Sequence, residues 1–337
     1  MEIGHLTWAP TLEGPALALE DEAFGFDIRY FGDNTCMHSD VFSELRDAAR
    51  ATSRIKLGTS VTNTLTRHPS AVATAIAGVQ VLSGNRVICG VGKGDSAVAV
   101  IGEQPQRHKP FLERTAMLRA YLQGETIPIG DAGSRLEWLE RFDYTPVPLE
   151  IVATGPRMLR AAAALADRIT INVGTAPERL DWAFEQVDAG LEEAGRTRAD
   201  VTIGTFVMAA VDDDRDAALD RLRLRVAPMA HMASVKGVDL SAQPEQLRRV
   251  TQRLRDEYDY RGHVRGTTFT NQDFGNAGPI DREFADWYGL GGDGAYIRKR
   301  IDELEARGLQ YIFFAALERG EKERMVGTVL PAQPAGV

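Results

Sequence analysis

Two stretches decide the fold: Lys56-Leu57-Gly58-Thr59-Ser60-Val61-Thr62-Asn63 and Val87-Ile88-Cys89-Gly90-Val91-Gly92-Lys93-Gly94-Asp95-Ser96. Each begins as a short apolar run of the β type and ends in polar and glycine residues. Between them an apolar stretch opens at Pro69, and a proline fits the first turn of a helix. The two stretches therefore predict neighbouring strands joined by a helix, which is the repeating unit of a parallel sheet.

The same alternation of short apolar runs and longer amphipathic stretches extends along the chain in both directions. We expect strands at residues 3–8, 27–31, 55–61, 87–91, 151–153, 168–172, 201–211 and 310–315. Besides the helix that opens at Pro69, we expect helices at residues 41–52, 156–166, 177–194, 215–227 and 295–307. Eight such units predict an α/β fold and favour a closed (β/α)8 TIM barrel over an open doubly wound sheet.

Two segments interrupt this period. We expect a single domain, residues 1–337, with insertions at about 123–148 and 233–294. The second insertion combines a polar helix, residues 244–258, with a Gly/Thr/Asn-rich stretch at 261–278. Long insertions in barrels are often binding loops or lids, and we expect part of 261–278 to move and cover a bound ligand. A contact between subunits is the alternative reading of both insertions.

Composition excludes several classes of protein. With 39 basic and 48 acidic side chains among 337 residues, the formal charge is −9, which argues against nucleic acid as a partner. Two cysteines, Cys36 and Cys89, are too few for a disulfide framework and favour a reducing compartment. Residues 1–10 lack the pattern of a signal peptide, and no apolar run approaches the roughly 20 residues of a membrane span. We therefore expect a soluble, cytoplasmic protein.

The chemistry of a barrel lies where its strands end, so the residues that follow each strand are the candidates for a site. Those residues are polar or glycine-rich in this chain. They are Trp8, then Gly32-Asp33-Asn34, Ser60-Val61-Thr62-Asn63, Gly92-Lys93-Gly94-Asp95-Ser96, Thr154-Gly155-Pro156-Arg157 and Asn172-Val173-Gly174-Thr175.

The segment Thr154-Gly155-Pro156-Arg157 has the form of an anion site. Thr154 can cap the helix that follows, Gly155 lets the backbone approach a ligand, and Pro156 suits an early helical position. Free amides at the helix start would face a phosphate, and Arg157 would add a charge-assisted contact. An ordinary capped helix is the alternative.

The glycine-rich segment from Gly90 to Ser96 fits neither the mononucleotide P-loop nor the dinucleotide fingerprint. Its glycines suggest a backbone pressed against a flat ligand, with Asp95 and Ser96 available for polar contacts, or else a tight turn. The six histidines show no metal-ligand spacing, so no metal is expected. His5 lies inside the first strand, where alternation either aims it into the barrel as a catalytic group or leaves it a satisfied core histidine.

Several motifs together carry a family resemblance: residues 56–63, Thr66-Arg67-His68-Pro69, Ser83-Gly84-Asn85-Arg86 and the run from Gly90 to Val98. They resemble the luciferase-like flavin and deazaflavin oxidoreductases, and most closely the methylenetetrahydromethanopterin reductase branch. The resemblance covers nearly the whole chain. It includes Gly155-Pro156-Arg157-Met158-Leu159, Ala166-Asp167 and Gly308-Leu309-Gln310-Tyr311.

The resemblance implies a cofactor site across the strand ends. A reduced flavin or deazaflavin ring would lie against a backbone bulge at Ser60-Val61, and this peptide bond is predicted to be cis. The cofactor-binding residues would be Ser60, Val61, Thr62, Asn63, Gly92, Gly94, Asp95, Ser96, Thr154, Gly155, Pro156, Arg157, Asn172 and Gly174. Of these, Thr154 to Arg157 with Gly174 would hold the phosphate. The catalytic candidates are Asp33, Asn34 and His5. Because Asn34 stands where related enzymes place a histidine, the proton donor stays open.

The resemblance also implies a function. We expect an oxidoreductase in which a reduced deazaflavin coenzyme of the F-420 type transfers hydride to a small organic substrate, and in which the subunits form a homodimer. The alternative is a monooxygenase that uses reduced FMN from a separate flavin reductase and activates dioxygen. A third hypothesis is a barrel without catalytic activity that stores or senses a flavin. The pterin substrate is not carried over, because residues 233–294 depart most from the family pattern.

Overall fold

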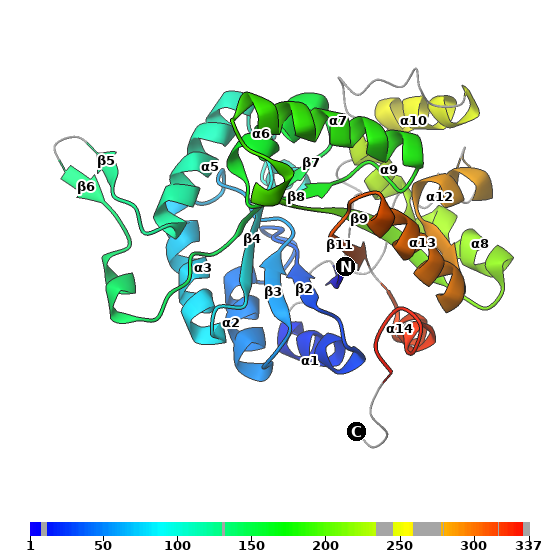
Figure 1. Cartoon of the computed structure of the whole chain (residues 1–337), viewed down its shortest axis with the longest axis horizontal. Helices are drawn as coiled ribbons and strands as arrows, with labels where there is room; N and C mark the ends of the chain where they lie inside the picture. The colour runs from blue at the N-terminus through cyan, green and yellow to red at the C-terminus, as the bar shows by residue number, and fades with distance from the viewer. Residues whose placement is uncertain are drawn as a thin grey trace.

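The structure is a computed structural model, which describes residues 1–7, 12–129, 132–233, 245–258, 278, 280–315 and 317–332. Its centre is a closed barrel of eight parallel strands with helices around it (Figure 1). The barrel strands are β1 (Glu2–Thr7), β2 (Ile28–Phe31), β3 (Lys56–Thr59), β4 (Val87–Val91), β7 (Leu149–Ala153), β8 (Arg168–Ile171), β9 (Thr202–Val211) and β11 (Tyr311–Ala315). The predicted (β/α)8 barrel is confirmed.

The strands follow one another around the barrel, and pairing of β8 with β9 closes it. A ninth strand, β10 (Leu290–Gly292), pairs with the end of β9. β10 has no apolar run that predicts a strand, because two of its three residues are glycines. A Cβ at Gly291 would lie 2.9 Å from the Leu219 side chain, so close packing against a neighbouring helix requires the glycine there.

Helices alternate with the strands and cover the outside of the barrel (Figure 1). They are α1 (Gly14–Phe24), α2 (Val41–Ala51), α3 (Pro69–Ser83), α4 (Ser96–Ala99), α5 (His108–Leu122), α6 (Pro156–Leu165), α7 (Pro177–Glu193), α8 (Arg215–Arg225), α9 (Ala227–Ala233), α10 (Glu245–Glu257), α12 (Arg282–Tyr288), α13 (Gly294–Ala306) and α14 (Arg319–Met325). Within the described part of the chain, none of them combines the length and the apolar character that crossing a bilayer requires.

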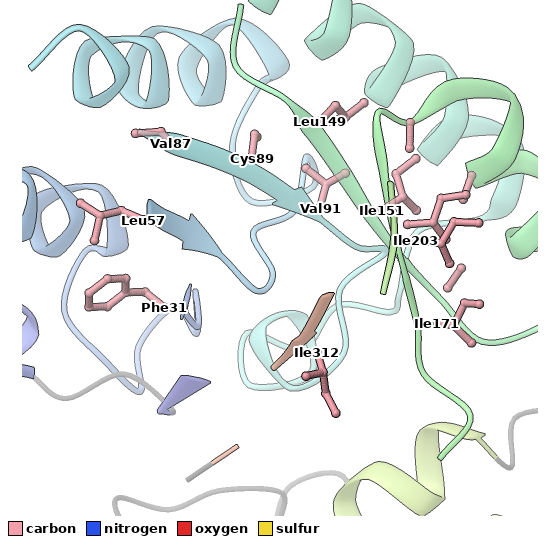
Figure 2. Close-up of a cluster of buried hydrophobic side chains, with 14 of the residues drawn as sticks. Phe31, Leu57, Val87, Cys89, Val91, Leu149, Ile151, Ile171, Ile203 and Ile312 are labelled. Atoms are coloured by element: carbon pink, nitrogen blue, oxygen red, sulfur yellow. The ribbon is translucent and has the colours of Figure 1, made fainter. Parts of the chain in front are cut away.

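Alternate residues of each strand face the helices or the barrel axis. Those facing outward form the apolar layer under the helices, including Leu57, Val91 and Ile151 (Figure 2). The barrel axis carries larger and more polar groups. The Tyr30 hydroxyl donates a hydrogen bond to Glu150 Oε2 over 2.7 Å, and the Thr170 hydroxyl donates to Glu150 Oε1 over 2.8 Å. The buried Glu150 carboxylate therefore has partners, as a charge inside a protein requires.

Several elements within the two segments predicted as insertions stand apart from the eight strands of the barrel. Residues 123–148 contain the antiparallel hairpin of β5 (Ile127–Ile129) and β6 (Ala132–Ser134), which projects from the barrel, and the 3₁₀ helix η1 (Glu137–Arg141) (Figure 1). The second insertion carries α10, close to the polar helix predicted at 244–258, and also α12 and β10. Except for Gly278, the expected lid at 261–278 lies outside the described residues, as does Trp8.

Candidate active site

The loops that follow β2 and β3 are joined through Asp33, which is buried. Its Oδ2 atom accepts hydrogen bonds from the Thr62 hydroxyl over 2.7 Å and from Arg67 Nη1 over 2.6 Å. Burial raises the pKa of Asp33, and the Arg67 guanidinium and the Thr62 hydroxyl oppose that shift. Asp33 is therefore a fixed carboxyl group that holds two loops in register.

A second contact joins the loops after β2 and β4. The Ser96 hydroxyl donates to Asn34 Oδ1 over 2.9 Å. Because Asn34 follows Asp33 and Ser96 follows Asp95, this hydrogen bond brings both acidic residues to the same edge of the barrel. The sequence predicted that these residues lie together, and the hydrogen bond is the contact that joins them.

Asp95 differs from Asp33 in its surroundings. Its Oδ2 atom is buried and has no hydrogen-bond partner among the described residues. Burial raises the pKa of Asp95 to about 6. Asp95 is thus a carboxyl group that takes up and gives off a proton near neutral pH.

The loops after β3 and β4 lie against each other. The Thr62 amide donates to the Gly90 carbonyl over 2.9 Å, and the Gly92 amide donates to the Thr62 carbonyl over 3.0 Å. The Ser60-Val61 peptide bond is cis, so this prediction is confirmed. A Cβ at Gly92 would lie 2.8 Å from Val61 Cγ2, which leaves no room for a side chain at that position.

Two asparagines also carry buried polar atoms that lack a partner among the described residues. The Asn63 Oδ1 atom accepts hydrogen bonds from the Leu65 and Thr66 amides, whereas its Nδ2 atom has no hydrogen-bond partner among the described residues. Asn172 directly follows β8, and its Nδ2 atom contacts the Met232 sulfur at 3.6 Å. Its Oδ1 atom has no hydrogen-bond partner among the described residues.

Unsatisfied buried polar atoms are costly, and three of those in the structure, on Asn63, Asp95 and Asn172, lie at the end of the barrel where ligands bind. Asn63 Nδ2 is a donor, Asn172 Oδ1 is an acceptor, and Asp95 Oδ2 is either, depending on its proton. A flat heterocycle with carbonyl and N–H groups on its edge, such as a flavin or deazaflavin ring, offers both kinds of partner. These residues therefore fit such a ring.

The predicted anion site at the start of α6 is organised differently from the expectation. Gly155 is the N-cap, in extended conformation, and Pro156 is the first helical residue. Thr154 precedes the cap by one residue and makes no capping hydrogen bond, so the prediction that Thr154 caps the helix is wrong. The Met158 and Leu159 amides both donate to the Gly155 carbonyl, which leaves the Arg157 amide as the first free donor of α6.

Gly94 and Gly174 supply backbone turns that other residues rarely adopt. Their φ angles are +86° and +84°, in the left-handed region that favours glycine. A Cβ at Gly174 would also lie 3.0 Å from the Tyr288 carbonyl oxygen. The next residue, Thr175, donates its amide to that same carbonyl over 3.1 Å. The loop after β8 is thereby fixed against α12.

His5 does not join these residues. Leu6 is the residue of β1 that faces the barrel axis, whereas His5 faces α1 and the loop before α14. Its Nε2 accepts from the Leu317 amide over 3.2 Å, which leaves Nδ1 to donate to Asp21 Oδ2 over 2.8 Å. Burial lowers the pKa of His5 to about 4. The alternation that could have aimed His5 into the barrel instead leaves it a satisfied core histidine.

Arg67 is a residue of the site that the sequence pattern did not predict. Arg67 neutralises Asp33 from a position 34 residues further along the chain, and a single sequence gives no sign of such a pairing. Arg67 does lie within one of the motifs that carry the family resemblance. In the described part of the chain, no three His, Cys, Asp or Glu side chains are arranged to hold a metal ion.

Comparison with known proteins gives one family and several relatives. The family of luciferase-like monooxygenases matches residues 11–311. The 5,10-methylenetetrahydromethanopterin reductase of Archaeoglobus fulgidus is 28% identical over 301 residues, which cover 86% of this chain and 85% of that protein. An F-420-dependent glucose-6-phosphate dehydrogenase of Microbacterium testaceum is 30% identical over 231 residues, covering 64% of this chain and 68% of that one.

Among solved structures, the coenzyme F-420-dependent tetrahydromethanopterin reductase of Methanopyrus kandleri superimposes with a TM-score of 0.73. The two sequences are 21% identical, and the superposition covers 96% of this chain and 95% of the other. At this level of identity the likeness shows the fold.

Proposed function

The chain belongs to the family of luciferase-like monooxygenases, and from this premise we propose that it is an oxidoreductase that uses a reduced coenzyme F-420 to transfer hydride to a small organic substrate. Relatives with this coenzyme dependence in their names align with most of the chain. The observation in the molecule that carries the proposal is the set of unpartnered buried polar atoms on Asn63, Asp95 and Asn172.

The residues predicted from the sequence would hold the cofactor from three places in the chain. Ser60 to Asn63 and Gly92 to Ser96 would lie along the ring, and the close packing of Gly92 against Val61 holds these two loops together. Thr154 to Arg157 with Gly174 would hold the phosphate, and the free Arg157 amide is its first donor. When bound, the reduced deazaflavin supplies the hydride and reacts poorly with dioxygen.

Proton transfer falls to Asp95 in this proposal. Its Oδ2 atom is buried and unpartnered, and its pKa of about 6 lets it exchange a proton near neutral pH. Asp33 is the positioning residue of the pair, because Thr62 and Arg67 already occupy its Oδ2. The Asn34 side chain accepts from Ser96 and keeps the two loops together. The absence of a histidine at position 34 is thus compensated by Asp95.

The second candidate function is a monooxygenase that takes reduced FMN from a separate flavin reductase and uses dioxygen. The family match favours it, because the family is described by luciferase-like monooxygenases. The two functions share the task of binding and shielding a ring, so the fold supports both. We further propose that the enzyme is a cytoplasmic homodimer with no nucleic-acid or membrane partner.

Titration of the purified protein with coenzyme F-420, FMN and reduced FMN separates the two functions. The measurements are the affinity for each cofactor and the uptake of oxygen by the reduced complexes. We expect tight deazaflavin binding without oxygen uptake. Tight binding of reduced FMN with oxygen consumption, and no deazaflavin binding, would establish the monooxygenase instead.

A further inference from the structure

The loop after β1 contains a leucine in a strained conformation. Leu12 has a φ angle of +66°, in the left-handed region that bulky residues rarely adopt. Its side chain is 80% exposed, whereas the other large apolar side chains exposed in the described part of the chain reach at most 51%. Neither the strain nor the exposure stabilises the free protein. Strained residues persist where the surrounding structure holds them, and they cluster where ligands bind.

A buried carboxylate holds this leucine in place. Glu44 belongs to α2, which packs beside α1 (Figure 1). Its Oε1 atom accepts from the Leu12 amide over 2.7 Å and also from the Ser39 hydroxyl, and its Oε2 atom accepts from the Gly14 amide over 2.9 Å. A Cβ at Gly14 would collide with Glu44 Oε2, so the glycine lets the carboxylate come this close. Glu44 therefore joins the loop after β1 to the loop after β2.

The start of α2 is also joined to the candidate active site. Asp40, the N-cap of α2, accepts from Arg67 Nη2 over 2.9 Å, and Arg67 Nη1 donates to Asp33 Oδ2 over 2.6 Å. Because Ser39 directly precedes Asp40, a continuous series of contacts leads from Leu12 to Asp33. Leu12 is thus fixed at the mouth of the barrel, on the side of the loop that carries Asp33.

We propose that Leu12 is a specificity-determining residue that contacts an apolar part of the substrate, and that Glu44 is the positioning residue that presents it. A leucine side chain offers only apolar contact, so an alkyl group of the substrate would leave water against it, whereas a wholly polar substrate would gain nothing. A loop that is fixed before the substrate arrives makes this contact without a further cost of ordering. The inference rests on the proposed function, and it adds the substrate class: an organic hydride acceptor with an alkyl group beside its reacting carbon.

Straight-chain methyl ketones test this contact, because they combine a carbonyl group that can accept hydride with an alkyl chain of graded length. The protein is loaded with oxidised F-420, so that no turnover occurs. Saturation-transfer NMR titrations then give the dissociation constants of acetone, methyl propyl ketone and methyl pentyl ketone. We expect each lengthening by two methylenes to tighten binding to the wild type by roughly five- to tenfold, as apolar surface leaves water.

Three variants assign this dependence on chain length to the two residues. Leu12→Gly removes the side chain and keeps the backbone, because glycine adopts a positive φ freely, and its affinity should rise less than about twofold per step. Leu12→Met restores an apolar side chain of similar size and should recover most of the wild-type dependence. Glu44→Gln leaves one acceptor oxygen for two backbone amides, so its dependence should shrink as in Leu12→Gly. Quenching of the fluorescence of bound F-420 checks that each variant still holds the coenzyme.

The matched control is Glu22→Gln, near the other end of α1. Glu22 also accepts from backbone amides, those of Arg54 over 2.7 Å and Ile55 over 2.8 Å, but just before β3, at the end of the barrel opposite the mouth. This variant should keep the wild-type dependence on chain length.

The outcomes separate the inference from the proposed function. Affinity that does not grow with chain length in the wild type, or a dependence that survives in Leu12→Gly, would overturn the inference and leave the proposed function in place. An equal loss in Glu44→Gln and Glu22→Gln would show general loosening of the barrel and would overturn the positioning role of Glu44. Absence of coenzyme binding by the wild type would overturn the proposed function and the inference together.

Discussion

At the scale of single residues, the site separates two carboxyl groups by their surroundings. Asp33 and Asp95 both lie at the barrel mouth, and burial raises the pKa of each. Arg67 and Thr62 contact Asp33, whereas the Oδ2 atom of Asp95 has no partner in the described part of the chain. Two acids with different environments can divide the tasks of positioning and proton transfer.

Asp95→Asn tests this division. The variant keeps the shape of the side chain and removes its titration, so turnover with a saturating cofactor should fall by roughly 10² to 10⁴, the range for loss of a general acid or base. The kcat of the wild type should change as the pH rises through about 6, where the Asp95 carboxyl group loses its proton. This limb of the pH profile should be absent in the variant. A pH profile of kcat for both proteins measures the effect. A variant that keeps the limb would assign it to another group.

Arg157→Ala tests the phosphate site. Hydrogen bonds to charged groups contribute about 1.5 to 3 kcal/mol, and we expect the loss of cofactor affinity near the lower end, because the Arg157 side chain is exposed and solvent screens it. The rate at saturating cofactor should change much less. Calorimetric titration with the cofactor gives the affinity. Unchanged affinity would mean that the phosphate binds elsewhere.

At the scale of elements, the sequence predicted the strands better than it predicted what their side chains face. β4 has the predicted bounds, Val87–Val91, because polar and glycine residues flank an apolar run. β3 ends earlier than predicted, at Thr59, since the following residues leave the sheet and Thr62 bonds to the loop after β4. Period-two alternation defines two faces of a strand, but it does not say which face is inside. That is why the direction of His5 could not be read from the sequence.

The position of His5 leads to a prediction about β1, α1 and α14. Asp21 of α1 accepts from His5 and from Lys322 of α14, the latter over 2.7 Å, and all three side chains are buried. His5→Gln should remove part of this network and lower the free energy of unfolding by about 1 to 3 kcal/mol. Cofactor affinity should stay unchanged. Urea unfolding and cofactor titration measure the two quantities, and lost affinity in a fully folded variant would restore a role for His5 at the site.

At the scale of the whole molecule, the barrel explains why so much of the site was predictable. Parallel strands bring their carboxyl ends to one edge, so residues that follow β2, β3, β4, β7 and β8 were expected together before any contact was known. Contacts that depend on side chains far apart in the sequence were not predictable. The Arg67–Asp33 ion pair arises only when the barrel closes.

The closed barrel also determines how the stability of the molecule depends on pH. His5 and His231 are both buried, and burial lowers the pKa of each to about 4, below the ordinary value of 6.5. Between these values the unfolded chain binds more protons than the folded protein, so stability falls as the pH falls. Asp95 acts in the opposite direction, because its pKa rises from 3.8 to about 6 and the folded protein then binds the extra proton.

Two histidines outweigh one carboxyl group, so the free energy of unfolding should fall by an amount on the order of 3 kcal/mol from pH 6.5 to pH 4. Asp95→Asn removes the opposing contribution, and its loss of stability over the same range should therefore be steeper than that of the wild type. At pH 7 the variant should be the more stable protein, because the wild type then carries a buried charge that asparagine lacks. Urea unfolding at several pH values between 4 and 7 measures both curves. Parallel curves for the two proteins would mean that Asp95 titrates in the folded protein as it does in water.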